Sequence, residues 1–247
     1  MFNTLEQFYY DARRNKWFRY FTVFCRVALA AGFIPSGIVK IMGERFTALP
    51  SNHPLGHYFD VLYQTGFYYT FIGVGQIITA LLLLIPRTAL LGALIYFPTI
   101  LNICVLAYAT RFEGTRITTM MLLANIYLLC WDYERIKHIL PFKQAKTGSE
   151  LATEKTVNNR FPFVFFGGVV AAVALVIIIN AYIFDIRPGN SMIECTNGCK
   201  GSKYPKASCG FCDCIYSEGK PLDSCLKEYK LAKERERNDS LGTTISK

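Results

Sequence analysis

The fold is decided by residues 67–109, which read FYYTFIGVGQIITALLLLI, then PR, then TALLGALIYFPTILNICVLAYA. Neither apolar run contains a charged residue, and each approaches or reaches the about 20 residues that a helix needs to cross the hydrocarbon of a bilayer. Proline ends a helix and threonine is a good N-cap. We therefore expect a tight antiparallel hairpin of two membrane-spanning helices, in which Pro86 ends the first helix and Thr88 caps the second.

Three more apolar blocks extend this pattern, at residues 18–41, 115–133 and 161–186. The chain has 247 residues, of which 52% are hydrophobic and 18% charged, and this composition excludes a disordered chain, a collagen and a coiled coil. The sequence predicts an all-α membrane protein. Its expected parts are a four-helix transmembrane bundle (1–133), a cytoplasmic linker (134–160), a fifth transmembrane helix (161–186) and a cysteine-rich extracytoplasmic tail (187–247).

The expected orientation follows from lysines and arginines in the short segments that flank the blocks. One side carries eleven of them: Arg13, Arg14, Lys16, Arg19, Arg87, Arg135, Lys137, Lys143, Lys146, Lys155 and Arg160. The other side carries five: Lys40, Arg45, Arg111, Arg116 and Arg187. This bias puts the N-terminus in the cytoplasm, and five spans then put the tail outside, as expected for a bacterial inner-membrane protein with a periplasmic tail. The formal net charge of +9 is thereby explained by membrane topology, and we expect no nucleic-acid partner.

Six of the nine cysteines are crowded into the tail: Cys195, Cys199, Cys209, Cys212, Cys214 and Cys225. Disulfides persist in oxidising compartments, and a domain this small usually needs cross-links to be stable. Three interpretations remain open: structural disulfides, a zinc site that uses four of the six thiolates, or a redox-active pair at Cys209 and Cys212, whose spacing is C-x-x-C. Connectivity cannot be read, because six cysteines allow 15 pairings.

Residues 17–133 resemble the DoxX-like family of small four-helix membrane proteins. The resemblance is carried by residues 26–29 (RVAL), 33–40 (FIPSGIVK), 73–76 (GVGQ) and 81–93 (LLLLIPRTALLGA). It implies quinone-linked sulfur or thiol oxidation, often as an accessory subunit of a membrane oxidoreductase, and so makes a quinone cofactor conceivable. Gln76 stands where the family's second span often carries an acid, so no proton-coupled role is carried over.

Polar side chains inside the apolar blocks are the other candidates for a binding site. Arg26 lies about a third of the way along the first block, Gln76 and Asn125 lie near the middle of theirs, and Asn102 lies nearer the outer face. Such groups are costly against lipid, so they either join helices to one another or converge on a pocket for a quinone or a lipid head group. For Arg26, extension to the cytoplasmic interface is the alternative. At the outer end, Lys40 is expected to pair with Glu44, its i+4 neighbour.

The loop after the first block contains His53, His57 and Asp60, in an H-x-x-x-H-x-x-D series. Pro54 lies between the histidines, so we expect a solvated loop and no metal there. Its apolar second half, around residues 58–63, predicts a helix or re-entrant segment on the outer surface. No Ser-His-Asp set, phosphate loop or dinucleotide fingerprint is present, which disfavours hydrolases and nucleotide-driven functions.

Two functions follow from these observations. The first is an accessory subunit or scaffold of a membrane complex, with a link to redox chemistry through the resemblance, that contacts other membrane or periplasmic subunits through its tail. The alternative is a quinone-linked thiol or sulfur oxidoreductase that uses Cys209 and Cys212.

Overall fold

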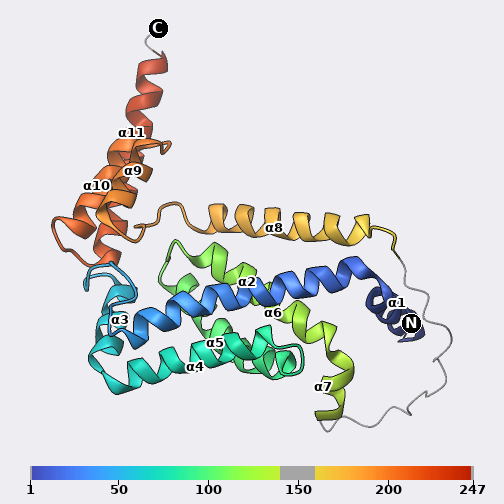
Figure 1. The fold of residues 1–247 in the computed structure, drawn as a ribbon. Coiled ribbons are helices and arrows are strands. Elements are labelled where there is room, and N and C mark those ends of the chain that lie inside the picture. The colour runs from blue at the N-terminus through green and yellow to red at the C-terminus, as the bar shows by residue number, and fades with distance from the viewer. Residues whose placement is uncertain (1, 140–158, 246–247) are drawn as a thin grey trace.

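The computed structural model describes residues 2–139 and 159–245, and these form helices joined by turns (Figure 1). The helices are α1 (Phe2–Arg14), α2 (Lys16–Ile41), α3 (Pro54–Gln64), α4 (Phe67–Leu84), α5 (Ala89–Ala109), α6 (Thr115–Trp131), α7 (Tyr133–Ile139), α8 (Phe163–Ile183), α9 (Met192–Lys200), α10 (Pro205–Tyr216) and α11 (Leu222–Ile245). The expected all-α class is confirmed for the described residues.

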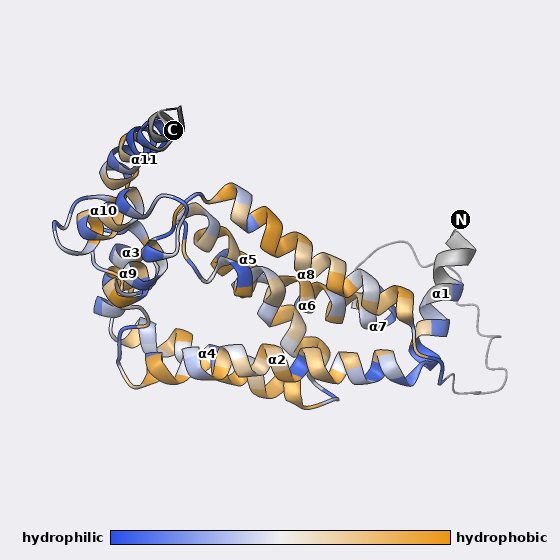
Figure 2. Ribbon diagram, turned by 90° about the horizontal axis from the view of Figure 1, so that it is seen from above, coloured by the Kyte–Doolittle hydropathy of each residue, from blue (hydrophilic) through white to orange (hydrophobic). Residues whose placement is uncertain are grey.

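Four helices in the described ranges are long and apolar enough to cross a membrane: α2, α4, α5 and α8. Apolar side chains cover their outward faces, as at Phe71, Val105 and Val170, which are all more than half exposed. Figure 2 shows these helices as mainly hydrophobic, while hydrophilic residues collect at the ends of the bundle and in the tail. These features indicate an integral membrane protein. The expected fourth span corresponds to α6, which has 17 residues and is shorter than the other four.

Helices α2, α4, α5 and α6 pack into one bundle with a shared apolar core. Leu29, Phe33, Tyr96 and Leu128 are all buried there, and the Phe33 and Tyr96 rings stack with their centroids 3.7 Å apart. Helix α8 lies along the outside of this bundle against α6, with most of its surface exposed. Only part of the chain's apolar surface is thus covered by protein, and the remainder faces lipid.

The contact between α2 and α4 depends on two glycines. A Cβ at Gly37 would lie 2.8 Å from the carbonyl oxygen of Gly73, and a Cβ at Gly73 would lie 2.7 Å from that of Gly37. Small residues let helix backbones approach closely, and in a membrane such packing replaces much of the hydrophobic driving force. By contrast, a Cβ at Gly75 would have no neighbour within 4 Å.

The hairpin between α4 and α5 forms as expected, with one correction. Thr88 stands at the N-cap position of α5, but its side chain makes no capping hydrogen bond there. Its hydroxyl instead donates to the Leu82 carbonyl at 3.0 Å, because the turn folds Thr88 back over the end of α4. Thr88 therefore closes the preceding helix instead of starting the next one.

The loops and small helices divide between the two ends of the bundle (Figure 1). Helices α1 and α7 lie at one end, where Arg13 bonds to Asp132 and the Tyr9 hydroxyl donates to the Trp131 carbonyl at 2.8 Å. Helix α3 lies at the other end, together with α9, α10 and α11. Because α8 runs from the first end to the second, the cysteine-rich tail and the α2–α4 loop meet on the same side.

The boundaries predicted for the linker and for the fifth apolar block differ from those in the structure. The predicted linker was to begin at Glu134, but residues 133–139 form α7, and the remainder of the linker up to residue 158 lies outside the described residues. The fifth predicted block, 161–186, corresponds to α8, which is shorter at both ends.

Candidate functional site

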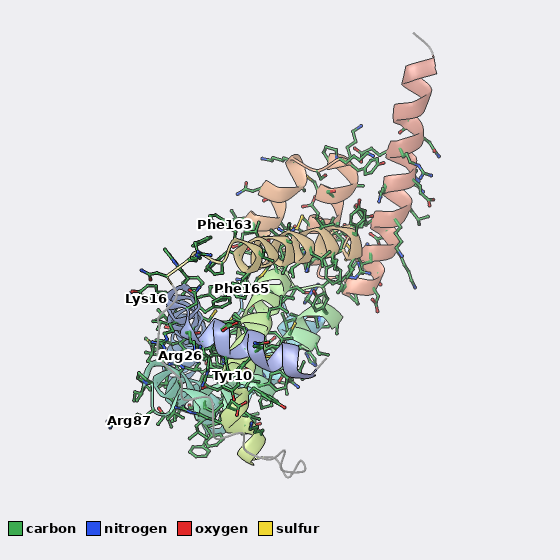
Figure 3. The ribbon with its side chains drawn as sticks, turned by 90° about the vertical axis from the view of Figure 1, so that its right-hand side faces the viewer. Tyr10, Lys16, Arg26, Arg87, Phe163 and Phe165 are labelled. Carbon is green, nitrogen blue, oxygen red and sulfur yellow. A yellow bond between two sulfur atoms is a disulfide. The ribbon has the colours of Figure 1, made fainter. Side chains whose placement is uncertain are left out.

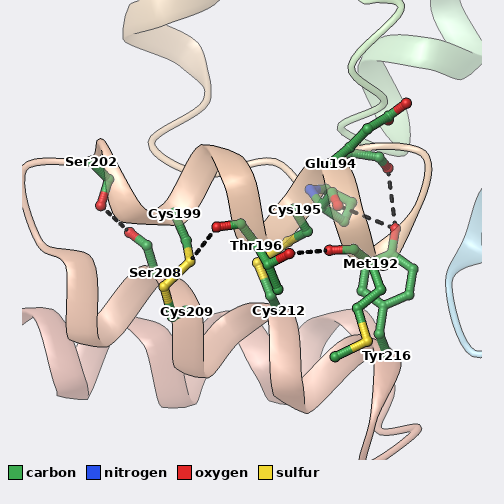
Figure 4. The surroundings of a disulfide bond; sticks show 12 residues. Met192, Glu194, Cys195, Thr196, Cys199, Ser202, Ser208, Cys209, Cys212 and Tyr216 are labelled. Atoms are coloured by element: carbon green, nitrogen blue, oxygen red, sulfur yellow. Dashed lines mark hydrogen bonds between the residues drawn. A yellow bond between two sulfur atoms is a disulfide. The ribbon is translucent and has the colours of Figure 1, made fainter.

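The tail is a three-helix domain cross-linked by three disulfides, two of which are drawn in Figure 4. Cys195 pairs with Cys212 and Cys199 with Cys209, which joins α9 to α10, and Cys214 pairs with Cys225, which joins α10 to α11. The Cα–Cα distances are 5.8, 5.1 and 5.7 Å, within the range of protein disulfides. The expectation of structural disulfides is confirmed.

The same pairing bears on the two other interpretations of the tail. All six sulfurs are bonded to one another in pairs, which leaves no thiolate among them to bind zinc. Cys209 and Cys212 are bonded to different partners, so the C-x-x-C spacing does not form a bond of its own, and Cys212 is 1% exposed. Thiol exchange requires access to a sulfur. The arrangement therefore gives no support to redox chemistry at Cys209 and Cys212.

An apolar core that includes the buried cysteines also holds the tail helices together. Phe211, Ile215 and Leu222 are buried in it, and the Tyr229 ring meets Phe211 edge-on at 6.0 Å. The carboxylate of Glu236 accepts from the backbone N–H of Ala207 at 2.9 Å, so α11 also closes the first turn of α10. The three cross-links and this core give one rigid module, which we call the stapled module (residues 192–236).

The stapled module is fixed to the loop between α2 and α4. The side-chain amide of Asn52 donates to two carbonyls, that of Ile215 in the last turn of α10 at 2.9 Å and that of Lys220 in the α10–α11 turn at 2.6 Å. The Thr47 hydroxyl donates to the side chain of Asn190, just before the module, at 2.6 Å. Because these contacts hold the module near its start and at its α10–α11 junction, it is docked on the bundle instead of being attached through α8 alone. The sequence analysis missed Asn52, whose only signal was its place in the polar stretch 50–54.

His53 lies next to these contacts and corrects the expected solvated loop. It is 0% exposed and stands at the N-cap of α3, where its Nδ1 accepts from the Leu55 N–H at 3.2 Å. Pro54 occupies the first turn of α3, where proline fits, so it starts the helix and does not break it. Burial lowers the pKa of His53 to about 4 and keeps its ring neutral.

His57 and Asp60, the other two residues of the series, have surroundings that differ from those of His53. His57 is exposed, and Asp60 forms an ion pair with Arg45 at 2.9 Å. Among the described residues, Cys214, Glu218 and Glu228 do lie close enough to share a metal ion. However, Cys214 is in a disulfide, and the Lys220 ammonium already binds both carboxylates, at 2.8 and 2.9 Å.

Within the bundle, the four polar candidates from the sequence do not converge. Arg26 lies 3.8 Å from Asp132, at the end of α6 that faces α1. Asn125 is fully buried and donates to the Ala93 carbonyl at 3.3 Å, which ties α6 to α5. Asn102 is exposed on α5. These partners are those of side chains that join helices to one another, which was one of the two expectations, and one shared pocket for a quinone or a lipid head group stays a prediction.

Gln76 belongs to a separate cluster nearer the outer end of the bundle. Its side-chain oxygen accepts from the Ser36 hydroxyl at 3.2 Å, and Ser36 accepts from the Lys40 ammonium at 2.7 Å. Ser36 is ten residues beyond Arg26, which corresponds to about 15 Å along the helix. The expected pair of Lys40 with Glu44 does not form, because the ammonium turns back to Ser36 and lies 4.3 Å from the Phe46 ring centroid.

Two further polar residues were missed. Asn180, inside the apolar α8, is fully buried and donates to the Tyr108 hydroxyl of α5 at 3.1 Å, which fixes α8 to the bundle. Asp132 forms ion pairs with Arg13 at 3.1 Å and with Arg26 at 3.8 Å. The sequence does single out both residues, because Asn180 interrupts the most apolar run and Asp132 is an acidic residue within a basic flanking segment.

These features define an all-helical integral membrane protein that carries a disulfide-bonded helical module. The chain is 32% identical over 120 residues to the Uncharacterized protein YwoB of Bacillus subtilis (strain 168), in an alignment that covers 46% of this chain and 78% of that protein. The chain therefore belongs to the same family as YwoB. No family model matches the sequence, and no solved structure matches it.

Proposed function

We propose that the chain crosses the membrane five times, with the N-terminus in the cytoplasm and the stapled module outside. Helix α6, with 17 residues, is at the lower limit for a span. The position of the stapled module supports its crossing, because this module docks on the α2–α4 loop and both must lie on one side. The excess of lysine and arginine at the opposite end gives the direction. The relative comes from a bacterium, which agrees with a bacterial membrane.

Within this topology, the function that the geometry supports best is that of an accessory subunit or scaffold of a membrane complex. The observation that carries it is the stapled module, docked rigidly on the bundle while α11 continues from Glu236 to Ile245, away from the bundle (Figure 1). Glu234 and Arg235 are exposed on this helix. A rigid, charged helix held outside the membrane is suited to recognise another protein through complementary charges.

The resemblance of residues 17–133 to DoxX-like proteins makes a membrane oxidoreductase the kind of complex that we expect. The role that we propose is attachment and not electron transfer. Cys209 and Cys212 are tied up in structural disulfides, and the polar side chains expected to hold a quinone lie apart.

Co-purification of the full chain in a mild detergent tests this proposal. We expect Arg235→Glu to lose a specific membrane or extracytoplasmic protein that the unchanged chain retains, because it reverses the charge of one exposed side chain on α11. Lys200→Glu, at the exposed end of α9, makes the same change of charge elsewhere on the stapled module and should keep the partner. Identical partners for both variants, with all three disulfides intact, would contradict the proposal.

A further inference from the structure

A basic pocket lies at the end of the bundle that carries α1 and α7. Its volume is about 330 Å³, and it opens between α2 and the end of α6. The residues that line it are Arg13, Arg19, Thr22, Val23, Arg26 and Trp131. Figure 3 looks onto this end, with Arg26 on α2. Three of the six lining residues are arginines and none is acidic.

Among the described residues, the ion pairs leave an excess of positive charge in this pocket. Asp132 is the acid paired with the lining arginines, at 3.1 Å from Arg13 and 3.8 Å from Arg26, and it also faces Arg135 at 3.9 Å. At 3.8 Å the contact with Arg26 is an ion pair and not a hydrogen bond. One carboxylate therefore serves three guanidinium groups, and Arg19 lies outside this set of ion pairs.

The hydrogen bonds of the guanidinium groups are also incomplete. Arg13 uses one terminal nitrogen for the Trp131 carbonyl, at 2.9 Å, and for Asp132, while its buried Nε has no hydrogen-bond partner. Arg26 has only 16% of its side chain exposed. Buried cations are costly unless they are paired and hydrogen-bonded, so an anion in the pocket would satisfy donors that the protein leaves open.

The surroundings of the pocket select an amphiphile over a soluble anion. Val23 and Trp131 form its apolar wall, and Val23 belongs to a face of α2 whose side chains point out of the protein. Tyr20, Phe24 and Val27 continue this face and are 66%, 63% and 50% exposed. An acyl chain can follow this face into the bilayer while its head group stays among the arginines.

From these observations we propose that the pocket binds the phosphate group of an anionic membrane lipid. Arg19 and Arg26 would hold the phosphate oxygens through the planar donor geometry of guanidinium, and Trp131 would lie at the level of the head groups. Basic pockets between transmembrane helices suit such lipids in general. The site is independent of the stapled module and of the proposed role as a subunit.

Lipid binding to the full chain, freed of lipid in detergent, tests the proposal. The probes are phosphatidylglycerol, phosphatidylcholine and inorganic phosphate, and native mass spectrometry measures occupancy. We expect phosphatidylglycerol to bind more tightly than phosphatidylcholine. Arg19→Gln should weaken this binding by about tenfold, which corresponds to the loss of one hydrogen bond between charged groups. Arg19 has no carboxylate partner among the ion pairs of the described residues, but its Nε donates to the Arg13 carbonyl at 3.1 Å. A thermal melt of Arg19→Gln therefore checks that Arg13 and its contact with Asp132 are kept.

The matched control is Arg87→Gln, which removes the same charge at the exposed α4–α5 turn, away from Arg26 in Figure 3. It should leave the affinity unchanged. Arg26→Gln should weaken binding as Arg19→Gln does, and a thermal melt separates this effect from any loss of stability. Equal effects of Arg19→Gln and Arg87→Gln would overturn the proposal. So would equal binding of the two lipids, or inorganic phosphate competing fully at the same concentration, which would assign the pocket to a soluble anion.

Discussion

Replacing Asn52 by alanine should release the stapled module from the bundle. The Asn52 amide makes two hydrogen bonds, to the carbonyls of Ile215 and Lys220. Each is worth about 1 kcal/mol net, so their loss should cost about 2 kcal/mol of docking free energy. That change corresponds to an about 30-fold larger population of undocked module. The Thr47–Asn190 contact remains in the variant and keeps the module in place most of the time.

Hydrogen exchange of the purified full chain measures this opening. Residues 47–56 include both side chains that make the docking contacts, and the exchange of their amides is expected to rise with the undocked population when docking is fast. Ser51→Ala is the matched control, because the Ser51 hydroxyl bonds to Asp60 within the loop and not to the module. The reasoning would be refuted if Asn52→Ala and Ser51→Ala exchanged at the same rate in this segment while both retained all three disulfides.

Three further predictions concern packing, cross-linking and pH. Gly73→Ala should lower the thermal stability of the bundle by about 1–3 kcal/mol because its Cβ would meet the backbone of α2, whereas Gly75→Ala should be neutral; equal melting temperatures would contradict the close contact. Replacing both Cys214 and Cys225 by serine opens a loop with a sequence separation of 11, and should lower the unfolding free energy of the stapled module by about 2.8 kcal/mol in denaturant. An unchanged midpoint would show that the apolar core holds the module together without this disulfide. Because the pKa of His53 is lowered in the folded protein, the neutral His53 ring contributes its full stability above about pH 6.5, and this contribution is lost as the pH falls toward 4, by up to about 1.4 kcal/mol per pH unit. If the melting temperature of His53→Asn depends on pH as strongly as that of the unchanged chain, His53 is not the source of the pH dependence.

The membrane helices were the predictable part of the fold. The apolar runs at 67–85 and 88–109 gave α4 and α5 nearly to the residue, because a bilayer sets helix length and the short turn after Leu84 leaves little freedom. The cross-linking of the tail was predictable for a similar reason, since six cysteines in so short a segment need partners. Their connectivity depends on which helix faces which, and this was decided only by the packing of α9, α10 and α11.

The rotation of each helix about its own axis was the part that sequence could not predict. Helices that are apolar all round carry little amphipathic signal, so nothing in the sequence showed that Gln76 faces Ser36 while Asn125 faces Ala93. For the same reason the pairing of Arg26 with Asp132 was not predicted. His53 was expected to be solvated because it follows polar residues, whereas it is fully buried and the backbone of Thr110, distant in sequence, lies beside it.

Five crossings of the membrane would place the stapled module outside. Two reporter fusions measure this topology, one after Lys247 and one inserted near Gly148. We expect the reporter after Lys247 to be active only in an oxidising, extracytoplasmic compartment and the one near Gly148 to report the cytoplasm. Cytoplasmic signal at both positions would contradict this topology, because α6 or another of the five helices would then not cross the membrane.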